Sequence, residues 1–360
     1  MKNILITGGA GFIGSNFIRY LLDTRVEVVI HNLDLLTYAG SLENLKDLPN
    51  PERYHFIQGD ICDRAVVDAV LKENEIELVV HFAAESHVDR SIYGPEAFIR
   101  TNIQGTFILL EAVKAYWKED SGGFREGVRF HHISTDEVYG TLAPEAPAFT
   151  EEHQILPNSP YAASKAASDL LVRSYYHTYG LPVTITNCSN NYGPNQFPEK
   201  LIPLMIQNAI EGKPLPIYGD GKQIRDWLYV EDHCQAIWTV IQSGKLGETY
   251  NVGGENQPTN LEIVHMICSI LDREFPDSDH VPHLDLVEYV PDRPGHDRRY
   301  AMNIEKIRRE LAWSPEVDLE QGLESTVAWY INNQEWLEEI RNQQDYQSWV
   351  KNNYRDRSAS

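Results

Sequence analysis

Short apolar runs alternate with longer amphipathic segments through the first half of the chain. The runs have the length of strands, and the segments between them carry apolar residues at the three- to four-residue spacing of a helix. The expected strands cover residues 4–6, 26–30, 54–57, 78–82, 128–133 and 183–186. The expected helices cover residues 12–23, 64–74, 97–118 and 160–179. This alternation predicts an α/β fold with a doubly wound parallel sheet that helices cover on both faces.

The sequence pattern changes after the last of these strands. Prolines and glycines become frequent there, and the expected helices and strands become shorter. No flexible linker separates the two parts, so we expect a smaller mixed α/β lobe rather than an independent fold. We assign residues 1–191 to the first domain and 192–345 mostly to the lobe, with some segments returning to the sheet. Residues 319–330 and 334–340 are expected to be helical, and 346–360 form a C-terminal tail.

Charge limits the possible partners. The chain has 360 residues, with 31 Lys and Arg against 53 Asp and Glu, and its formal charge is −22. A nucleic-acid binder needs a basic surface, so a nucleic-acid partner is not expected. An anionic small molecule would need local basic residues.

The four cysteines lie far apart, and no pair has the spacing of a zinc site or a redox motif. Such isolated cysteines fit reduced thiols in the cytoplasm. The N-terminal apolar run is too short for a signal peptide, and no run of about 18 apolar residues could span a membrane. We therefore expect a cytoplasmic protein with no membrane association and no metal site.

A glycine-rich turn follows the first expected strand. Gly9, Gly11 and Gly14 form Gly-x-Gly-x-x-Gly, and Gly8 adds an overlapping Gly-x-x-Gly-x-x-Gly. Glycines let the backbone approach a pyrophosphate that faces the N-terminus of the next helix. Asp34 lies twenty residues after Gly14, where a carboxylate can bind the adenosine ribose and repel a 2′-phosphate. The pattern predicts a Rossmann-type domain that favours NAD over NADP.

Tyr161 and Lys165 are four residues apart in an expected helix that begins at Ser159 and Pro160. The spacing places the phenol and the ammonium on one helix face. A nearby ammonium lowers the pKa of a tyrosine, which makes Tyr161 a usable base toward an alcohol. This pair also occurs by chance, but the dinucleotide motif earlier in the chain favours hydride chemistry.

Together these features resemble the extended short-chain dehydrogenase/reductases. Longer runs spread over almost the whole chain are similar to the dTDP-glucose 4,6-dehydratase family within that group. These runs cover residues 81–89, 130–140, 187–194, 225–227 and 291–300. The resemblance implies a homodimer, with the helices over 106–118 and 162–176 at the contact.

Asp136 and Glu137, directly after the fifth expected strand, favour dehydration over simple hydride exchange. Loss of water across C5–C6 of a hexose needs a base and an acid, and neighbouring carboxyl groups can serve as both if their environments split their pKa values. The resemblance implies that Tyr161 and Lys165 take the C4 hydroxyl proton while NAD⁺ accepts hydride from C4 and later returns it to C6. It also implies that Glu137 removes the C5 proton, Asp136 protonates the departing C6 oxygen and Thr135 hydrogen-bonds the C4 oxygen. The implied product is dTDP-4-keto-6-deoxy-D-glucose plus water.

The resemblance also implies the full set of site residues. The catalytic residues are Thr135, Asp136, Glu137, Tyr161 and Lys165. The cofactor-binding residues are Gly8, Gly11, Phe12, Ile13, Gly14, Asp34, Leu35, Thr37, Asp60, Ile61, Ala83, Ala84, Ser86, Thr101, Ser134, Tyr161, Lys165 and Asn191. The substrate-binding residues are Ser86, His87, Thr135, Asp136, Glu137, Asn190, Lys200, Leu201, Pro216, Ile217, Tyr218, Arg225, Asn260, Arg293 and His296. Lys200, Arg225 and Arg293 are the candidate cations for the pyrophosphate of the substrate.

The chain departs from the family pattern at two places. The family often has a lysine where this chain has Leu35, which alters contacts near the adenosine half of the cofactor. The loop between Gly140 and Tyr161 is short, which bears on access to the site or on nucleotide preference.

Three alternative functions are open at this point. A UDP- or GDP-hexose 4,6-dehydratase differs only in the nucleotide base, which rests on the resemblance alone. A 4-epimerase has no need of the acid pair. A catalytically silent NAD-binding regulatory protein has no need of the five catalytic residues together.

Overall fold

The computed structural model describes residues 1–292 and 296–342. A seven-stranded parallel sheet lies at its centre, with strand order β10-β6-β5-β4-β1-β2-β3. Its strands are β1 (Asn3–Thr7), β2 (Val29–Asp34), β3 (Tyr54–Gln58), β4 (Leu78–His81), β5 (Arg129–Thr135), β6 (Val183–Cys188) and β10 (Thr249–Val252). The doubly wound α/β fold expected from the alternating pattern is confirmed.

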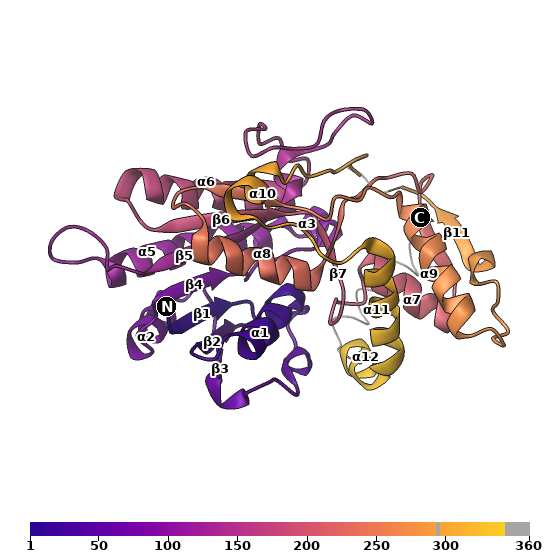
Figure 1. The fold of residues 1–360 in the computed structure, drawn as a ribbon, viewed down its shortest axis with the longest axis horizontal. Helices are drawn as coiled ribbons and strands as arrows, with labels where there is room; N and C mark the ends of the chain where they lie inside the picture. The colour runs from indigo at the N-terminus through magenta and orange to yellow at the C-terminus, as the bar shows by residue number, and fades with distance from the viewer. Residues whose placement is uncertain (293–295, 343–360) are drawn as a thin grey trace.

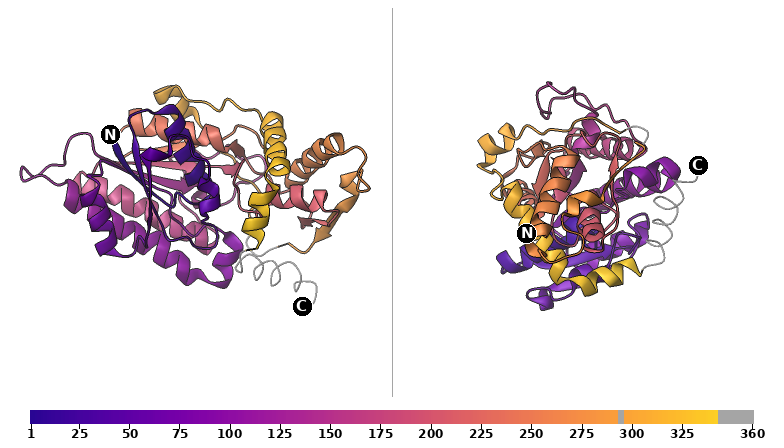
Figure 2. Two further views of the ribbon diagram at one scale, coloured as in Figure 1. Left: turned by 90° about the horizontal axis from the view of Figure 1, so that it is seen from below. Right: turned by 90° about the vertical axis from the view of Figure 1, so that its right-hand side faces the viewer.

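Helices cover both faces of this sheet (Figures 1 and 2). The helical elements beside it are α1 (Phe12–Thr24), α2 (Arg64–Glu73), α3 (Val88–Tyr93), α4 (Pro95–Phe98), η3 (Ile99–Gly105), α5 (Thr106–Trp117), α6 (Pro160–Tyr179), α8 (Val230–Ser243) and α10 (Glu305–Leu311). Short 3-10 turns occur at η1 (Leu42–Leu45), η2 (Pro51–Arg53), η4 (Asp136–Tyr139) and η5 (His283–Leu286). The single helix expected over 97–118 is divided into α4, the π-helical η3 and α5.

Alternate residues of each strand pack on opposite faces of the sheet, as the pleat requires. Leu5 and Val79 pack with α2, α5 and α6, whereas Ile4 and Ile6 pack with α1 and α8. All four side chains are fully buried, and each such burial contributes roughly 1.5–3 kcal/mol. Because both faces are covered, the strands read as continuous apolar runs.

The smaller lobe lies beside the carboxyl ends of the strands (Figure 1). Its elements are β7 (Asn190–Tyr192), α7 (Leu201–Ile210), β8 (Leu215–Tyr218), β9 (Trp227–Tyr229), α9 (Asn260–Glu274), β11 (Val287–Val290), α11 (Leu319–Asn332) and α12 (Gln334–Arg341). β8 pairs with β11, and β7 pairs with β9. β10 comes from the same half of the sequence but joins the large sheet beside β6. The tail over 346–360 lies outside the described residues.

The second strand was predicted over 26–30, and this boundary was wrong. Val26 is 83% exposed, and the strand instead runs to Asp34. His31 and Asn32 interrupt the apolar run, yet both are buried. The Asn32 Oδ1 atom accepts a hydrogen bond from the backbone N–H of Gly9 at 3.0 Å, so this polar side chain anchors the glycine turn.

Among the described residues, no helix is long and apolar enough to cross a membrane. The four cysteines are unpaired, with Cys188, Cys234 and Cys268 buried and Cys62 half-buried.

Candidate active site

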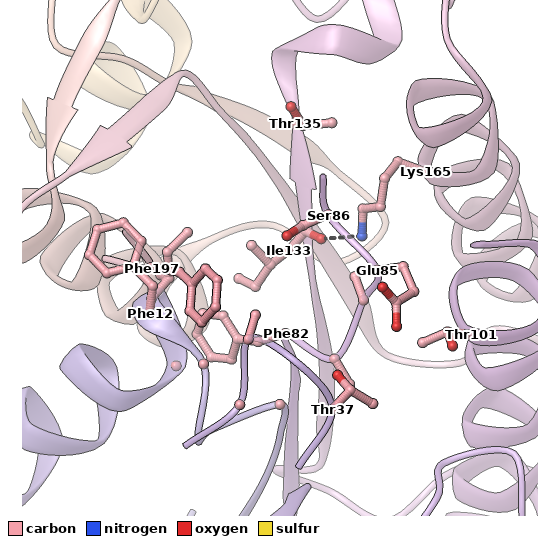
Figure 3. Close-up of a pocket in the computed structure, with 18 of the residues that line it drawn as sticks. Phe12, Thr37, Phe82, Glu85, Ser86, Thr101, Ile133, Thr135, Lys165 and Phe197 are labelled. Atoms are coloured by element: carbon pink, nitrogen blue, oxygen red, sulfur yellow. Dashed lines mark hydrogen bonds between the residues drawn. The ribbon is translucent and has the colours of Figure 1, made fainter. Parts of the chain in front are cut away.

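One large pocket opens where the strands of the sheet end and the lobe begins, with lining residues from both (Figure 3). In open α/β sheets, ligands bind at the carboxyl ends of the strands. The predicted residues that line the pocket are Gly8, Gly11, Phe12, Ile13, Gly14, Asp34, Leu35, Thr37, Asp60, Ile61, Ala83, Ala84, Ser86, Thr101, Ser134, Thr135, Asp136, Glu137, Tyr161, Lys165, Asn190, Asn191 and Lys200. The pocket therefore brings every expected cofactor-binding and catalytic residue together.

The glycine turn has no room for side chains. Gly8 has a φ of +74°, and a Cβ atom there would lie 2.5 Å from the backbone nitrogen of Ala83. A Cβ atom on Gly14 would lie 2.5 Å from the carbonyl oxygen of Gly8. Helix α1 begins after Gly11 without a side-chain cap for its first N–H groups, and its first three residues line the pocket. Such a helix start is suited to a phosphate group.

Asp34 closes β2 beside this turn. Its carboxylate accepts hydrogen bonds from the backbone N–H groups of Ala10 at 2.9 Å and Leu36 at 2.8 Å. Burial raises the pKa of Asp34, and these backbone hydrogen bonds oppose the shift. The carboxylate is thus held rigidly at the pocket edge, where it fits the two hydroxyls of an adenosine ribose.

Asp34→Ala is expected to weaken NAD binding by about 10- to 100-fold, because a hydrogen bond to a charged group contributes roughly 1.5–3 kcal/mol. Loss of the negative charge should also reduce the preference for NAD over NADP. Titration of the apoprotein with each cofactor, followed by protein fluorescence, measures both quantities. Asp63→Ala removes a carboxylate that caps α2 and does not line the pocket, so it is the matched control. An unchanged NAD to NADP affinity ratio in Asp34→Ala would contradict the assignment.

The acid pair follows β5 directly. The Thr135 hydroxyl accepts a hydrogen bond from the backbone N–H of Glu137 at 3.3 Å and donates to Oδ1 of Asp136 at 3.2 Å. Asp136 is 2% exposed, and its Oδ2 atom has no hydrogen-bond partner among the described residues. Burial, with the charges of Glu137 and Asp226 in support, raises the pKa of Asp136 well above its usual range. Asp136 is therefore suited to be an acid. The adjacent Glu137 is less deeply buried than Asp136.

Tyr161 and Lys165 project from the first turns of α6. Ser159 caps this helix by accepting a hydrogen bond from the backbone N–H of Ala162 at 3.1 Å. The Lys165 ammonium donates to the carbonyl oxygen of Ile133 on β5 at 2.7 Å (Figure 3). Tyr161 lines the same pocket as Thr135 and the acid pair, so the start of α6 and the end of β5 meet there.

The expected lowering of the Tyr161 pKa by Lys165 is wrong for this arrangement. Burial raises the pKa of Tyr161 well above its usual range, and the charge of Glu137 raises it further. Lys165 is itself buried, which lowers its own pKa. The ammonium is directed at Ile133, so burial and the neighbouring carboxylate outweigh it.

Sequence reasoning missed a buried polar cluster behind Lys165. Asp169 lies one turn further along α6 and accepts a hydrogen bond from the Ser134 hydroxyl at 2.7 Å. Its second carboxylate oxygen lies 3.2 Å from Nε2 of His132. Burial raises the pKa of Asp169 to about 7. The charge of the Asp169 carboxylate opposes the lowering of the Lys165 pKa that burial causes, but does not cancel it. The signal in the sequence was the regular spacing of Tyr161, Lys165 and Asp169 at four-residue intervals on one helix face.

A second group missed from the sequence connects the loop after β2 to the lobe. Glu199 lines the pocket, is 4% exposed and pairs with Arg90 at 3.2 Å. The Arg90 guanidinium lies 3.6 Å from the centroid of the Tyr38 ring, which also lines the pocket. Phe197 meets the same ring edge-on. No local motif marks these residues, because they meet only through the fold.

Several predicted substrate residues lie apart from the lining of this pocket. His87 caps α3, Leu201 begins α7, and Asn260 begins α9. Pro216, Ile217 and Tyr218 belong to β8.

Two charged residues of the same predicted set also lie outside the lining. Arg225 stacks on Tyr300 at 4.4 Å and donates to the carbonyl of Asp297, while His296 pairs with Asp292 at 2.6 Å. Arg293 lies outside the described residues. A substrate role for all these residues stays a prediction.

Comparison with known proteins identifies the family of the chain. The family model described as GDP-mannose 4,6 dehydratase matches residues 5–326. The dTDP-glucose 4,6-dehydratase of Shigella flexneri is 53% identical over 98% of this chain and 99% of its own length. A crystal structure of dTDP-glucose 4,6-dehydratase from Bacillus anthracis in complex with NAD has a TM-score of 0.83 and 46% identity, covering 94% of this chain and 100% of that one. The Streptomyces venezuelae enzyme DesIV, a dTDP-glucose 4,6-dehydratase with NAD and TYD bound, has a TM-score of 0.85 and 44% identity over 94% of this chain and 99% of that one. This chain therefore belongs to the dTDP-glucose 4,6-dehydratase family.

Proposed function

We propose that five residues at the end of β5 and the start of α6 divide among themselves the dehydration of dTDP-glucose. The chain is an NAD-dependent hydro-lyase that converts dTDP-D-glucose to dTDP-4-keto-6-deoxy-D-glucose and water. The observation that carries the division of roles is the acid pair Asp136 and Glu137, which lines one pocket with Tyr161 and Lys165.

The described residues fit the cofactor. The side-chain-free turn at Gly8 and Gly14 would hold the pyrophosphate, and Asp34 would hold the adenosine ribose. When bound, NAD⁺ supplies the acceptor for hydride at C4 and the donor to C6, and its positive charge favours the Tyr161 phenolate.

Tyr161 acts as the base toward the C4 hydroxyl, and Thr135 hydrogen-bonds the same oxygen. The ketone formed at C4 makes the C5 proton acidic, and Glu137 removes it. Asp136 protonates the departing C6 oxygen, a role that suits it because burial raises its pKa and so favours the protonated carboxyl. Glu137 then returns a proton to C5. Each well-placed acid or base contributes roughly 10²–10⁴-fold to the rate.

The substrate's nucleotide occupies the lobe side of the pocket in this proposal. Lys200 supplies a cation at the pocket wall, which an anionic substrate needs on a protein with a net charge of −22. Asn190 and Ser86 also line the pocket and support the sugar and phosphate groups.

Incubation of the purified enzyme with dTDP-glucose, followed by the alkali-induced absorbance of the 4-keto product, tests the activity. UDP-glucose and GDP-mannose under identical conditions test the nucleotide base. Turnover of dTDP-glucose well above the other two is expected. Turnover of either of these without product from dTDP-glucose would overturn the assignment of the base.

We infer a homodimer that forms through α5 and α6. Exposed apolar side chains lie on these helices and on the elements packed beside them, including Ile99 at 52%, Phe107 at 45% and Leu170 at 53%. An exposed apolar surface of this kind marks an interaction site, and a second copy can bury it by pairing the same face with itself.

Leu170→Glu is expected to convert the dimer to a monomer, since it places a charge on the apolar face of α6. Size-exclusion chromatography with light scattering measures the mass. Leu284→Glu is the matched control, because Leu284 is 39% exposed in η5 of the lobe and should leave the mass unchanged. A monomeric wild-type enzyme would refute the inference.

The predicted cytoplasmic location finds support in the thiols. Cys188, Cys234 and Cys268 are buried and unpaired. Stable unpaired thiols are typical of a reducing compartment.

A further inference from the structure

Helix α6 carries a buried carboxylate that the proposed roles leave unused. Asp169 is four residues after Lys165, so the two side chains are neighbours on the face of α6 that also carries Tyr161. Asp169 is 6% exposed and Lys165 is 4% exposed. Burial of a single charge without an opposite charge nearby is strongly unfavourable. The carboxylate is therefore a candidate partner for the buried ammonium.

One imidazole lies between the two charged groups. The Nε2 atom of His132 is 3.2 Å from Oδ1 of Asp169 and 3.5 Å from Nζ of Lys165. Burial lowers the pKa of His132 well below its usual range, which favours the neutral ring. Among the residues that the structure describes, Lys165 makes no direct ion pair. The carboxylate therefore acts on the ammonium at short range, across a neutral ring.

The end of β5 holds both charged groups in place. The second carboxylate oxygen, Oδ2 of Asp169, accepts a hydrogen bond from the Ser134 hydroxyl at 2.7 Å. The carbonyl oxygen of the preceding residue, Ile133, accepts a hydrogen bond from Nζ of Lys165, also at 2.7 Å. Two consecutive residues of the strand thus bind the two charges, one each, and fix their separation.

We propose that Asp169 is a positioning residue, the counter-ion that keeps the buried ammonium of Lys165 charged. The charge of Asp169 raises the pKa of Lys165 against the lowering that burial causes, and Lys165 opposes the rise in the pKa of Asp169. Only a charged ammonium can stabilise the negative charge that develops when the C4 hydroxyl loses its proton. The inference rests on the proposed share of Lys165 in C4 oxidation.

The other titratable groups around this pair keep one charge state while Lys165 titrates. They come from four neighbouring elements: His81 from β4, His132 from β5, Tyr139 from η4 and Cys188 from β6. Burial lowers the pKa of both histidines well below their usual range. It raises the pKa of Tyr139, and it raises that of Cys188 to about 12. A change in the alkaline pH dependence can therefore be assigned to Lys165.

The pH profile of C4 oxidation in the holoenzyme tests the counter-ion. Asp169→Asn keeps an oxygen that can accept from Ser134 but removes the charge, so the alkaline decline of cofactor reduction should begin about one pH unit lower. Asp169→Glu keeps the charge and should keep the wild-type decline, although its longer side chain slows the reaction at every pH. Asp318→Asn, which changes the cap of α11 in the lobe, is the matched control. A wild-type alkaline decline in Asp169→Asn would overturn the proposal.

Thermal unfolding tests the pair without the reaction. At about pH 9, where the carboxylate is charged, Lys165→Met leaves it buried without its counter-ion, and adding Asp169→Asn removes that charge as well. The double variant should therefore unfold at a higher temperature than Lys165→Met alone. An equal or lower unfolding temperature would overturn the proposal. If the expected difference is found but the wild-type enzyme makes no product from dTDP-glucose, the charge pair stands and the proposed function has failed.

Discussion

Replacement of Tyr161 with phenylalanine is expected to slow C4 oxidation by about 10³-fold or more, within the roughly 10²–10⁴-fold that a positioned general base contributes. The variant removes only the phenol oxygen, so the aromatic ring still fills its buried site against Phe98. Without a base for the C4 hydroxyl, no hydride leaves C4, and all later steps stop with the first.

Rapid mixing of the enzyme with excess substrate, followed by the near-ultraviolet absorbance of reduced nicotinamide, measures this step directly. Tyr175→Phe is the matched control, because Tyr175 is on the same helix and its hydroxyl bonds to Glu111, outside the pocket. The control should reduce the cofactor at the wild-type rate. Normal cofactor reduction in Tyr161→Phe would mean that another group takes the C4 proton.

Periodicity predicted the sheet and its helical layers because alternating faces and helical repeats are local properties of the sequence. Residues 4–6 were identified as a strand, and β1 packs Ile4 and Leu5 on opposite faces. β2 was misplaced because His31 and Asn32 break the apolar run. The partners of the Asn32 side chain are Gly9 and Tyr54, and the His31 ring stacks on His55; the local sequence does not reveal these contacts.

That the expected cofactor and catalytic residues line one pocket could be predicted because most of them belong to short motifs with a defined geometry. The glycine turn, the acid pair and the Tyr161–Lys165 spacing can each be recognised from a few consecutive residues. Glu199 and Arg90 are 109 residues apart, so their pairing depends on the packing of the lobe against α3. No local pattern could have indicated it.

The sequence predicted which residues lie in the site better than it predicted their pKa values. Lys165 was expected to govern the pKa of Tyr161, but the direction of that shift follows from burial and from Glu137. Different pKa values for Asp136 and Glu137 were expected; burial raises the pKa of Asp136, and its difference from the pKa of Glu137 stays a prediction. Spacing indicates which groups are near one another, whereas desolvation depends on everything packed around them.

Glu137→Gln is expected to separate the two halves of the reaction. C4 oxidation should continue, because Tyr161 and Lys165 are unchanged, while loss of water should fall by roughly 10²–10⁴-fold without a base for the C5 proton. Reduced nicotinamide should therefore accumulate on the enzyme without formation of the 4-keto-6-deoxy product. Asp136→Asn is the matched variant, because it removes the acid but leaves the base. It should also stall dehydration, yet still allow the C5 proton to exchange with deuterium from the solvent.

The pH dependence of C4 oxidation gives a second test of Glu137, with a definite sign. The charge of Glu137 raises the pKa of Tyr161, so Glu137→Gln should lower that pKa. Tyr161 acts as a base only when it is deprotonated, and a lower pKa moves the rise of C4 oxidation to lower pH. Rapid-mixing rates of cofactor reduction across a pH series measure this shift. A variant that blocks C4 oxidation as completely as dehydration would contradict the division of labour between Tyr161 and Glu137. An unshifted profile would mean that Glu137 is too well screened to act on the phenol.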